Sequence, residues 1–590
     1  MPSSFSCSSM EKYLWLLVYI ALCILSVSVS GKVFVSIDCG ASGSFTDENT
    51  IVWKGDTDLI SNGVTHTVQP NYTVSRVMDT MRVFTTRKKN CYSIDATQGE
   101  KVLVRAGFNY GNYDRMSSPP TFDLQFNGNF WVTVNVSASK MYEAIYVVKS
   151  KFISVCVAQT KPNQFPFIST LEVRSLDSQM YNNIGTNYAL LMNERVAYGT
   201  NESIRFPMDP YDRIWEPIGA GTGLLNVRND ASSFIDTSDM PDNPPQAVLK
   251  NAISALYNNR TIIIGVGIMS YSIRYPTYLN WYFSEVESHN PAELRAFRIL
   301  VDDLPYSLPI SLQFRNVTSY VFSNLTITLN TTFTIDPIGV STLPPIVNAA
   351  EFFSISNALT DGTNKNDVEG LSSLQNAFEI LQEWGGDPCL PRPYSWEWIV
   401  CNNDPTPRVT SIKLDSFNLS GPLPNFGNMD ALEILDLHNN SLTGSIPSFL
   451  GALPNLKQLN LANNQFSGSI PKSLLRNSKL NFIYTGNTLL CTKGKSCPGS
   501  DENMTTKLPI ILGICIPVLL ILGAIVGVLV IRHKRRKVGV TRPSGDTGHR
   551  ANGTRGTTLG DNYDKKGVAE LDENTDERFY RSPAPLLGER

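Results

Sequence analysis

The feature that most constrains this chain is an uncharged apolar run near its C-terminus, Leu508 to Ile531. A helix rises about 1.5 Å per residue, so about 24 residues extend roughly 36 Å, enough to cross a hydrocarbon core of about 30 Å. A basic run, Arg532 to Lys537, follows directly. Because Lys and Arg collect on the cytosolic flank of a membrane helix, the sequence predicts a single-pass type I plasma-membrane protein. In this interpretation residues before 508 are extracellular, and 532–590 form a basic, disordered cytosolic tail.

The N-terminus and the glycosylation sequons agree with this topology. Tyr13 to Leu25 is an apolar run too short to span a bilayer, and small residues follow at Ser28 to Ser30. These features indicate a signal peptide at 1–30; a second membrane helix is the alternative. The N-x-S/T sequons predict N-glycosylation at Asn71, Asn135, Asn201, Asn259, Asn316, Asn324, Asn330, Asn418, Asn439 and Asn503.

Charge and cysteine content narrow the class of protein. The net charge is −3 and mixed along the chain, which argues against a nucleic-acid partner. Cysteine use fits an oxidising compartment, and spacing predicts the disulfides Cys389–Cys401, Cys491–Cys497 and Cys39–Cys91. Cys156 lies in an apolar strand-like run and is predicted to be a buried free thiol, with an intermolecular bridge as the alternative.

The body before the membrane run divides into a β-rich part and a repeat part. Short β-type runs separated by Gly, Asn and Pro turns fill 31–350 and predict two tandem β-sandwich lobes, split near 185–205. A helical linker and repeat cap are expected at 351–407, with Asp367 capping a helix at 366–381. The predicted fold class is therefore mainly β.

A repeat of about 24 residues runs through 408–490 and predicts a short leucine-rich-repeat solenoid. Asn440 and Asn464 occupy the repeat position whose amide side chain bonds the backbone of the turn, whereas Phe417 takes that place in the first copy. Residues 491–507 are expected to form a C-terminal cap and juxtamembrane segment.

Eight segments of 31–350 occur in a characteristic order: VFVSIDCG, NCYSI, GNYD, LEVR, YGT, DPYDRIW, NPPQAVLKNAI and WYFSE. Together they resemble a plant malectin-like domain. EWGGDPC followed by W-x-W-x-x-C resembles the linker that joins such domains to leucine-rich repeats. This arrangement is the ectodomain plan of symbiosis-receptor-type receptor kinases, and the 53 residues after the basic run are too few for the family's kinase. The resemblance implies a receptor-like protein that binds an extracellular saccharide or peptide and signals through a partner receptor kinase or co-receptor. A wall-binding lectin-type membrane anchor without signalling is the alternative.

We find no catalytic pattern. The five histidines form no metal-binding spacing, and GAGTG at 219–223 is expected neither to follow a strand nor to open a helix, so we interpret it as a turn. The sequence predicts no catalytic, cofactor or metal site, and therefore no enzyme.

Binding surfaces are the remaining candidates. Aromatic faces stack on sugar rings, so the loop with Tyr110, Asn112, Tyr113 and Asp114 is a candidate carbohydrate site, as the resemblance to animal malectin-type lectins also implies; a structural role for these tyrosines is the alternative. The basic run Arg87 to Lys89 suits an anionic wall polymer or is a solvated loop. The repeats expose a polar strand face suited to a peptide, formed by Glu433, Asp436, His438, Lys457, Gln458 and Asn460. In the membrane run, Gly523 and Gly527 would allow close contact with another helix.

Overall fold

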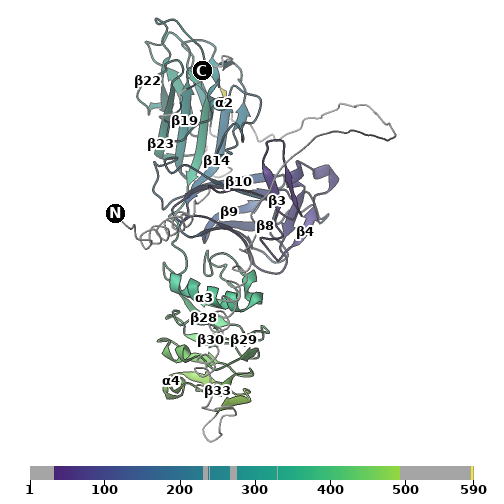
Figure 1. Ribbon diagram of the computed structural model, residues 1–590. Coiled ribbons are helices and arrows are strands. Elements are labelled where there is room, and N and C mark those ends of the chain that lie inside the picture. Colours follow the sequence, from purple (N-terminus) through teal and green to yellow (C-terminus); the bar gives the residue numbers. More distant parts are fainter. Residues whose placement is uncertain are drawn as a thin grey trace, which may run out of the picture. The chain divides into compact units, whose positions relative to one another are not determined.

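The computed structural model describes residues 32–229, 235, 237, 240–265, 275–328, 330–491 and 587–588 (Figure 1). Several predicted features lie outside the described residues: the signal peptide, Cys497, Asn503, the membrane run with Gly523 and Gly527, and the tail up to 586. Within the described residues, no helix combines the length and the apolar character that a bilayer crossing requires. The chain is mainly β, as predicted.

One long sheet runs through the first part of the chain (Figure 1). In spatial order it contains β2 (Ser44–Thr46), β3 (Val52–Gly55), β1 (Phe34–Asp38), β13 (Thr170–Ser175), β7 (Lys101–Phe108), β10 (Lys140–Val147), β14 (Leu190–Tyr198), β26 (Ala349–Ile355), β19 (Tyr275–Ser284) and β23 (Val317–Ile327), with β15 (Glu216–Ile218) beside β14. β14 pairs with β10 on one side and with β26 on the other. The long sheet therefore continues through the region where the sequence predicts a split between two lobes.

Smaller sheets complete two hydrophobic cores, one on each side of β14. The first core is closed by β6 (Lys89–Asp95), β11 (Phe152–Gln159), β8 (Thr121–Phe126) and β9 (Asn129–Asn135), and by β12 (Phe167–Ile168), β5 (Thr80–Val83) and β4 (Val64–Thr67). The second is closed by β16 (Leu224–Arg228), β17 (Asn251–Ala255) and β25 (Ile346–Val347), and by β21 (Leu304–Pro305), β20 (Ala296–Val301), β24 (Thr332–Pro337), β18 (Ile262–Gly265) and β22 (Ile310–Ser311). Short helices η1 (Pro70–Tyr72), η2 (Arg76–Met78) and α2 (Gln246–Leu249) lie between strands. Aromatic rings fill both cores, such as Phe122 against Phe167 at 5.4 Å and Trp281 against Phe352 at 5.3 Å.

Between the two cores, the long sheet carries a buried network of ion pairs. Asp212, from the segment DPYDRIW, accepts hydrogen bonds from Arg174 at 2.7 and 3.0 Å and from Arg205 at 2.9 Å through two nitrogens. Burial alone would raise the pKa of Asp212, but the neighbouring guanidinium groups hold it well below its usual range. Arg195 on β14 joins Glu143 of β10 at 2.9 Å to Glu351 of β26 at 2.6 Å. Asp212 and Arg195 therefore link residues on the two sides of β14.

The carboxyl of Glu194 on β14 differs from that of Asp212, because burial raises its pKa to about 7. The folded chain then holds this proton more tightly than the unfolded chain, so the stability that Glu194 contributes is fully present below about pH 4.5 and is lost as pH rises towards 7. Asp38 and Asp242, whose pKa values burial raises to about 6, act in the same direction.

We therefore expect Glu194 alone to lower the free energy of unfolding by about 2 kcal/mol between about pH 5.5 and pH 7.5. Urea unfolding of the full chain at several pH values measures this. Glu194→Gln should flatten the profile and stabilise the chain at the higher pH, whereas the exposed control Glu48→Gln should leave it unchanged. An equally steep profile in Glu194→Gln would refute the assignment.

A two-residue strand from the far end of the chain, β36 (Leu587–Gly588), lies beside β18. A single membrane crossing between residues 491 and 587 excludes this pairing, because β18 would be extracellular. Pairing of two residues contributes about 1–3 kcal/mol, whereas insertion of about 24 apolar residues gains several kcal/mol more than that. The crossing therefore remains our prediction.

The linker begins with α3 (Lys365–Ala377) and η3 (Glu379–Glu383). The side chain of Asn364 caps α3 by accepting from the amide of Asn366, so the prediction that Asp367 is the cap is wrong. Asp367 is already inside the helix, where its buried carboxylate accepts from the Arg408 side chain at 2.9 Å and the Val409 amide at 2.8 Å. It thereby ties the linker helix to the first repeat.

The repeats stack as a sheet of β27 (Ile399–Cys401), β28 (Val409–Lys413), β30 (Ile434–Asp436), β32 (Gln458–Asn460) and β34 (Asn481–Ile483). The outer turns carry β29 (Ser420–Pro422), β31 (Ser441–Thr443), β33 (Ser467–Ser469), β35 (Leu489–Cys491), η4 (Ser448–Ala452) and α4 (Lys472–Arg476). The Asn440 amide donates to the carbonyls of Leu414, Leu437 and His438, and the Asn464 amide makes the equivalent bonds one repeat later. The predicted role of both asparagines is confirmed. Asn487 makes the equivalent bonds in the decayed fourth repeat, and this role of Asn487 was not predicted from the sequence.

Two disulfides have both partners among the described residues. Cys389–Cys401 is confirmed. The predictions of a Cys39–Cys91 bridge and a free Cys156 are wrong, because Cys91 bonds Cys156 and Cys39 is a buried free thiol. Neighbouring strand residues face opposite sides, so Cys91 points away from the core that Tyr92 and Cys39 share, and it lies opposite Cys156 in the β6–β11 register. Cys491 is disulfide-bonded, but Cys497 lies outside the described residues, so that pairing stays a prediction.

Candidate functional site

The loop that follows β7 contains the four residues predicted to bind carbohydrate. Tyr110 is buried, and its hydroxyl donates to the Asp114 carboxylate. Burial and this hydrogen bond raise the pKa of Tyr110 to about 12. The Asn112 side chain, at a residue with φ +49°, accepts from the Ser117 amide at 2.8 Å. Tyr110, Asn112 and Asp114 therefore shape the loop, which leaves Tyr113 as the member of the set that faces a cavity.

The cavity next to Tyr113, here called the Tyr113 pocket, has a volume of about 320 Å³. It is lined by Gly40, Thr65, His66, Thr67, Gln69, Tyr113 and Arg115. The rings of His66 and Tyr113 lie 4.9 Å apart and form one aromatic wall. The volume is near the lower end of the range for small-ligand sites, and the lining combines an aromatic wall, hydroxyl groups and a cation. This chemistry suits a sugar ring or a polar peptide segment.

Apart from Tyr113, the pocket residues were not predicted from the sequence. Thr65, His66 and Thr67 form part of β4, far along the chain from the loop, and the pairing of β4 with β5 places them beside Tyr113. A local pattern carries no signal for such a meeting of distant segments. Burial also raises the pKa of Tyr113 to about 12, so its hydroxyl is neutral at physiological pH.

The basic run Arg87 to Lys89 binds the linker. The buried Lys89 ammonium donates to the carbonyls of Asp387 at 2.6 Å and Leu390 at 3.1 Å, and burial lowers its pKa to about 8. The Arg87 guanidinium stacks on the Trp384 ring at 3.8 Å and pairs with Glu383. Arg87 and Lys89 are therefore neither a free site for an anionic polymer nor part of a solvated loop.

The Gly-Gly step of the linker lies on the Cys91–Cys156 disulfide. Gly386 has φ +72°, and a Cβ there would lie 2.6 Å from the Cys91 sulfur and 2.8 Å from the Cys156 sulfur. Asp387 then closes the turn, since its side chain accepts from the amides of Thr363, Cys389 and Leu390. The segment GGDPC is thus the contact surface between the linker and the first core.

The strand face of the repeats is polar except at Ile434, and its role as a binding surface stays a prediction. Lys413, Asp436 and Asn460 are in register on successive strands, and Ile434 and Gln458 form the row beside them. His438 Nδ1 lies 2.7 Å from Asp436, and Lys457 pairs with Glu433 at 2.7 Å, so several predicted residues bind one another.

Most sequons lie where a glycan fits. The exposed ones are Asn71, Asn135, Asn201, Asn259, Asn316, Asn330, Asn418 and Asn439.

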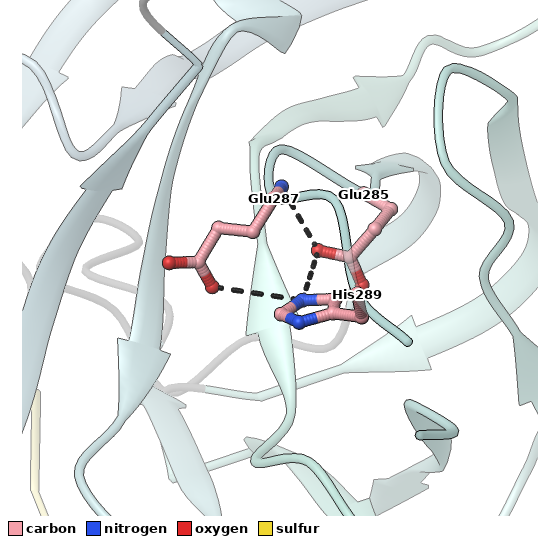
Figure 2. Close-up of side chains that lie close together, drawn as sticks. All are labelled: Glu285, Glu287 and His289. Carbon is pink, nitrogen blue, oxygen red and sulfur yellow. Dashed lines mark hydrogen bonds and ion pairs between the residues drawn. The ribbon is translucent and has the colours of Figure 1, made fainter. Parts of the chain in front are cut away.

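A cluster that resembles a metal site follows β19. Glu285, Glu287 and His289 bring ligand atoms within 4.8 Å of one another (Figure 2). However, the buried Arg295 guanidinium donates to Glu285 at 2.7 and 3.2 Å and lies 3.2 Å from the His289 ring nitrogen. This guanidinium already supplies the positive charge that a metal would bring, so the residues do not fit a cation site.

Comparisons with known proteins agree with this architecture. The family model described as Malectin-like domain matches residues 37–355, and the model described as Leucine Rich repeats (2 copies) matches 430–477. An uncharacterized Arabidopsis thaliana protein, At1g24485, is 34% identical over 349 residues, which cover 58% of this chain and 68% of that protein. The probable LRR receptor-like serine/threonine-protein kinase At1g05700 of the same plant is 34% identical over 437 residues, covering 70% of this chain and 49% of the kinase.

Among solved structures, the ANXUR1 extracellular domain from Arabidopsis thaliana matches with a TM-score of 0.47 and 17% identity, covering 55% of this chain and 97% of that domain. A structure of plant peptide RALF23 in complex with FER and LLG2 matches with a TM-score of 0.46 and 18% identity, covering 55% of this chain and 96% of the matched chain. The chain spans about half the length of the receptor kinases that it matches. From the family match and its placement before the repeats, this chain belongs to the malectin-like domain family.

Proposed function

We propose that this chain is a single-pass receptor-like protein of the plasma membrane that binds an extracellular peptide or carbohydrate and signals through a partner receptor kinase. The observation that carries the proposal is the alignment with receptor-like kinases across the malectin-like domain and repeats together, over 70% of this chain. Two contacts support the proposal, because they join the linker to the malectin-like domain: Lys89 donates to the linker carbonyl of Asp387, and Gly386 of the linker lies on the Cys91–Cys156 disulfide.

The Tyr113 pocket is the proposed ligand site. An aromatic wall beside hydroxyl, amide and guanidinium groups recognises polar ligands with an apolar face, and the pocket opens to solvent through the exposed Thr65 and Arg115. Both a saccharide and a peptide meet this description. If the same pocket served a wall-binding lectin anchor, the aromatic wall would bind sugar and no kinase would be needed.

Proximity labelling from the cytosolic tail in living plant cells tests the signalling part. We expect receptor kinases to be enriched over a control in which the labelling enzyme follows an unrelated single-pass protein. Absence of any kinase above that control would exclude signalling through a partner and favour the anchor.

Binding to the purified full chain in nanodiscs, screened on a glycan array and on a peptide library, tests the site. Tyr113→Ala should weaken the binding of any captured ligand at least tenfold, because it removes the aromatic wall. The matched control is Tyr257→Ala, an exposed tyrosine of the second half, which should change affinity less than twofold. A ligand that both variants bind equally well would show that the binding site lies outside the Tyr113 pocket.

A further inference from the structure

The Tyr113 pocket borders an open sheet edge. β4 is the outermost strand of the sheet β12-β5-β4, and its residues Val64, Thr65 and Thr67 are exposed. It carries no proline and no Lys, Arg, Asp or Glu, the residues with which proteins block an exposed edge. Such an edge is a template for pairing with another extended segment.

The β4–β5 ladder shows which backbone groups are open. The Val68 amide donates at 2.9 Å to the carbonyl of Asp79, the residue directly before β5, and this bond continues the register Val64↔Val83 to Thr67↔Thr80. Hydrogen-bonded residues alternate in an antiparallel pair, so Val64 and His66 point their backbone groups at β5. The amides and carbonyls of Thr65 and Thr67 therefore point to the free side.

The protein itself already uses this free side at the next position. The Gln69 amide has the same outward orientation as Thr65 and Thr67, and it donates to the Gly111 carbonyl at 2.8 Å. A side chain at 111 would not fit, because a Cβ there would lie 2.2 Å from a Val68 methyl carbon. The loop then turns away through Asn112 and Tyr113. The space that a paired strand would occupy beside Thr67 and Thr65 is thus the Tyr113 pocket.

Charge around this edge favours an acidic residue. Arg115 lines the pocket, and its side chain has no hydrogen bond or ion pair among the residues that the structure describes. The adjacent Asp114 carboxylate is directed at the Tyr110 hydroxyl and the Met116 amide. Arg115 is therefore free to pair with a carboxylate brought in by a ligand.

We propose that the Tyr113 pocket binds an extended peptide that adds to β4 as a further strand, with backbone hydrogen bonds to Thr65 and Thr67 and an acidic side chain on Arg115. The inference rests on the proposed ligand-binding function and selects a peptide as its ligand. Backbone pairing supplies affinity in this mode, and the pocket selects the side chain.

The test uses the glycosylated full chain in nanodiscs and a displayed library of random hexapeptides. We expect recovered peptides to be enriched in Asp and Glu. N-methylation of alternate amides in a recovered peptide, which removes donors of one edge, should weaken binding at least tenfold. N-methylation of the amides in between should change it less than twofold, because those face solvent.

Two variants of the chain give the complementary readout. Thr67→Pro removes an outward amide on an edge strand, where proline is tolerated, and should abolish peptide binding; Thr67→Val keeps the backbone and should retain it. Arg115→Ala should weaken acidic peptides at least fivefold. If Thr67→Pro unfolds the chain, the N-methylated peptides still decide the matter.

The inference is overturned if neither set of N-methylations weakens binding, if both sets weaken it equally, or if no peptide is recovered. It is also overturned if the pocket takes a glucose disaccharide that requires Tyr113 and is indifferent to Thr67→Pro. Sugar binding of this kind would contradict the peptide inference but remain consistent with the proposed function. A chain with neither a ligand nor a partner kinase would contradict both the inference and the proposed function.

Discussion

Replacing Asp212 by Asn is expected to lower the free energy of unfolding by about 3 to 5 kcal/mol. The side chain keeps its shape and its tolerance of the positive φ of 54°. The change removes the negative charge and replaces one acceptor oxygen by an NH2 donor that faces the N–H groups of the arginines. Arg174, which is buried, and Arg205 would then share Glu172 as their remaining counter-charge, while the buried Arg105 would keep Glu143 and Glu172. Urea unfolding of the full chain followed by circular dichroism measures the loss.

Asp303→Asn is the matched control. Asp303 also has a positive φ, 64°, but it lies exposed in the turn after β20, so its replacement should change stability by less than about 0.5 kcal/mol. Equal stabilities for the two variants would show that the ion network contributes little to holding the halves together.

Replacing Gly386 by Ala is expected to release the linker from the first core. A Cβ at this position would overlap the disulfide sulfurs, which costs about 1–3 kcal/mol, and the backbone conformation at φ +72° adds about 1–2 kcal/mol. Hydrogen exchange on the full chain should show faster exchange at the Leu390 and Trp396 amides, which the linker turns now protect.

The control for this change is Gly468→Ala in the repeats. Gly468 has a nearly identical φ of +75° but open space around its Cα, so it carries the backbone cost without the overlap. Exchange in the linker should be unaffected by it. The docking of GGDPC on the disulfide would be disproved if the linker amides of Gly386→Ala stayed as protected as those of Gly468→Ala.

The sequence predicted best what is local and periodic. Asn440 and Asn464 recur at the repeat spacing, and each bonds the turn beside it, so the pattern contains its own explanation. The role of Asn487 was not predicted, because the last repeat has lost the leucine spacing although the asparagine keeps its hydrogen bonds. Cys389–Cys401 was predicted for the same local reason.

Features that depend on strand register could not be predicted in this way. The Cys91–Cys156 bridge requires that β6 and β11 pair with these residues opposite each other, and the spacing along the chain says nothing of that. The pocket needs β4 beside the Tyr113 loop, and the roles of Arg87 and Lys89 need a linker almost three hundred residues further along the chain. Tyr113 was predicted as a candidate binding residue from its chemistry alone, whereas the residues that line the pocket with it could be identified only from the fold.

β14 has a consequence for how this protein can change over evolution. It completes the hydrogen bonding of β10 and of β26 at once, and Arg195 on it pairs with both neighbours. Gene rearrangements that duplicate, exchange or delete one half would leave an unpaired strand edge in the other half, and Arg195 would lose one of its two carboxylate partners. The inheritable module is consequently the whole span from β1 to β26, and shuffling can act only at its ends.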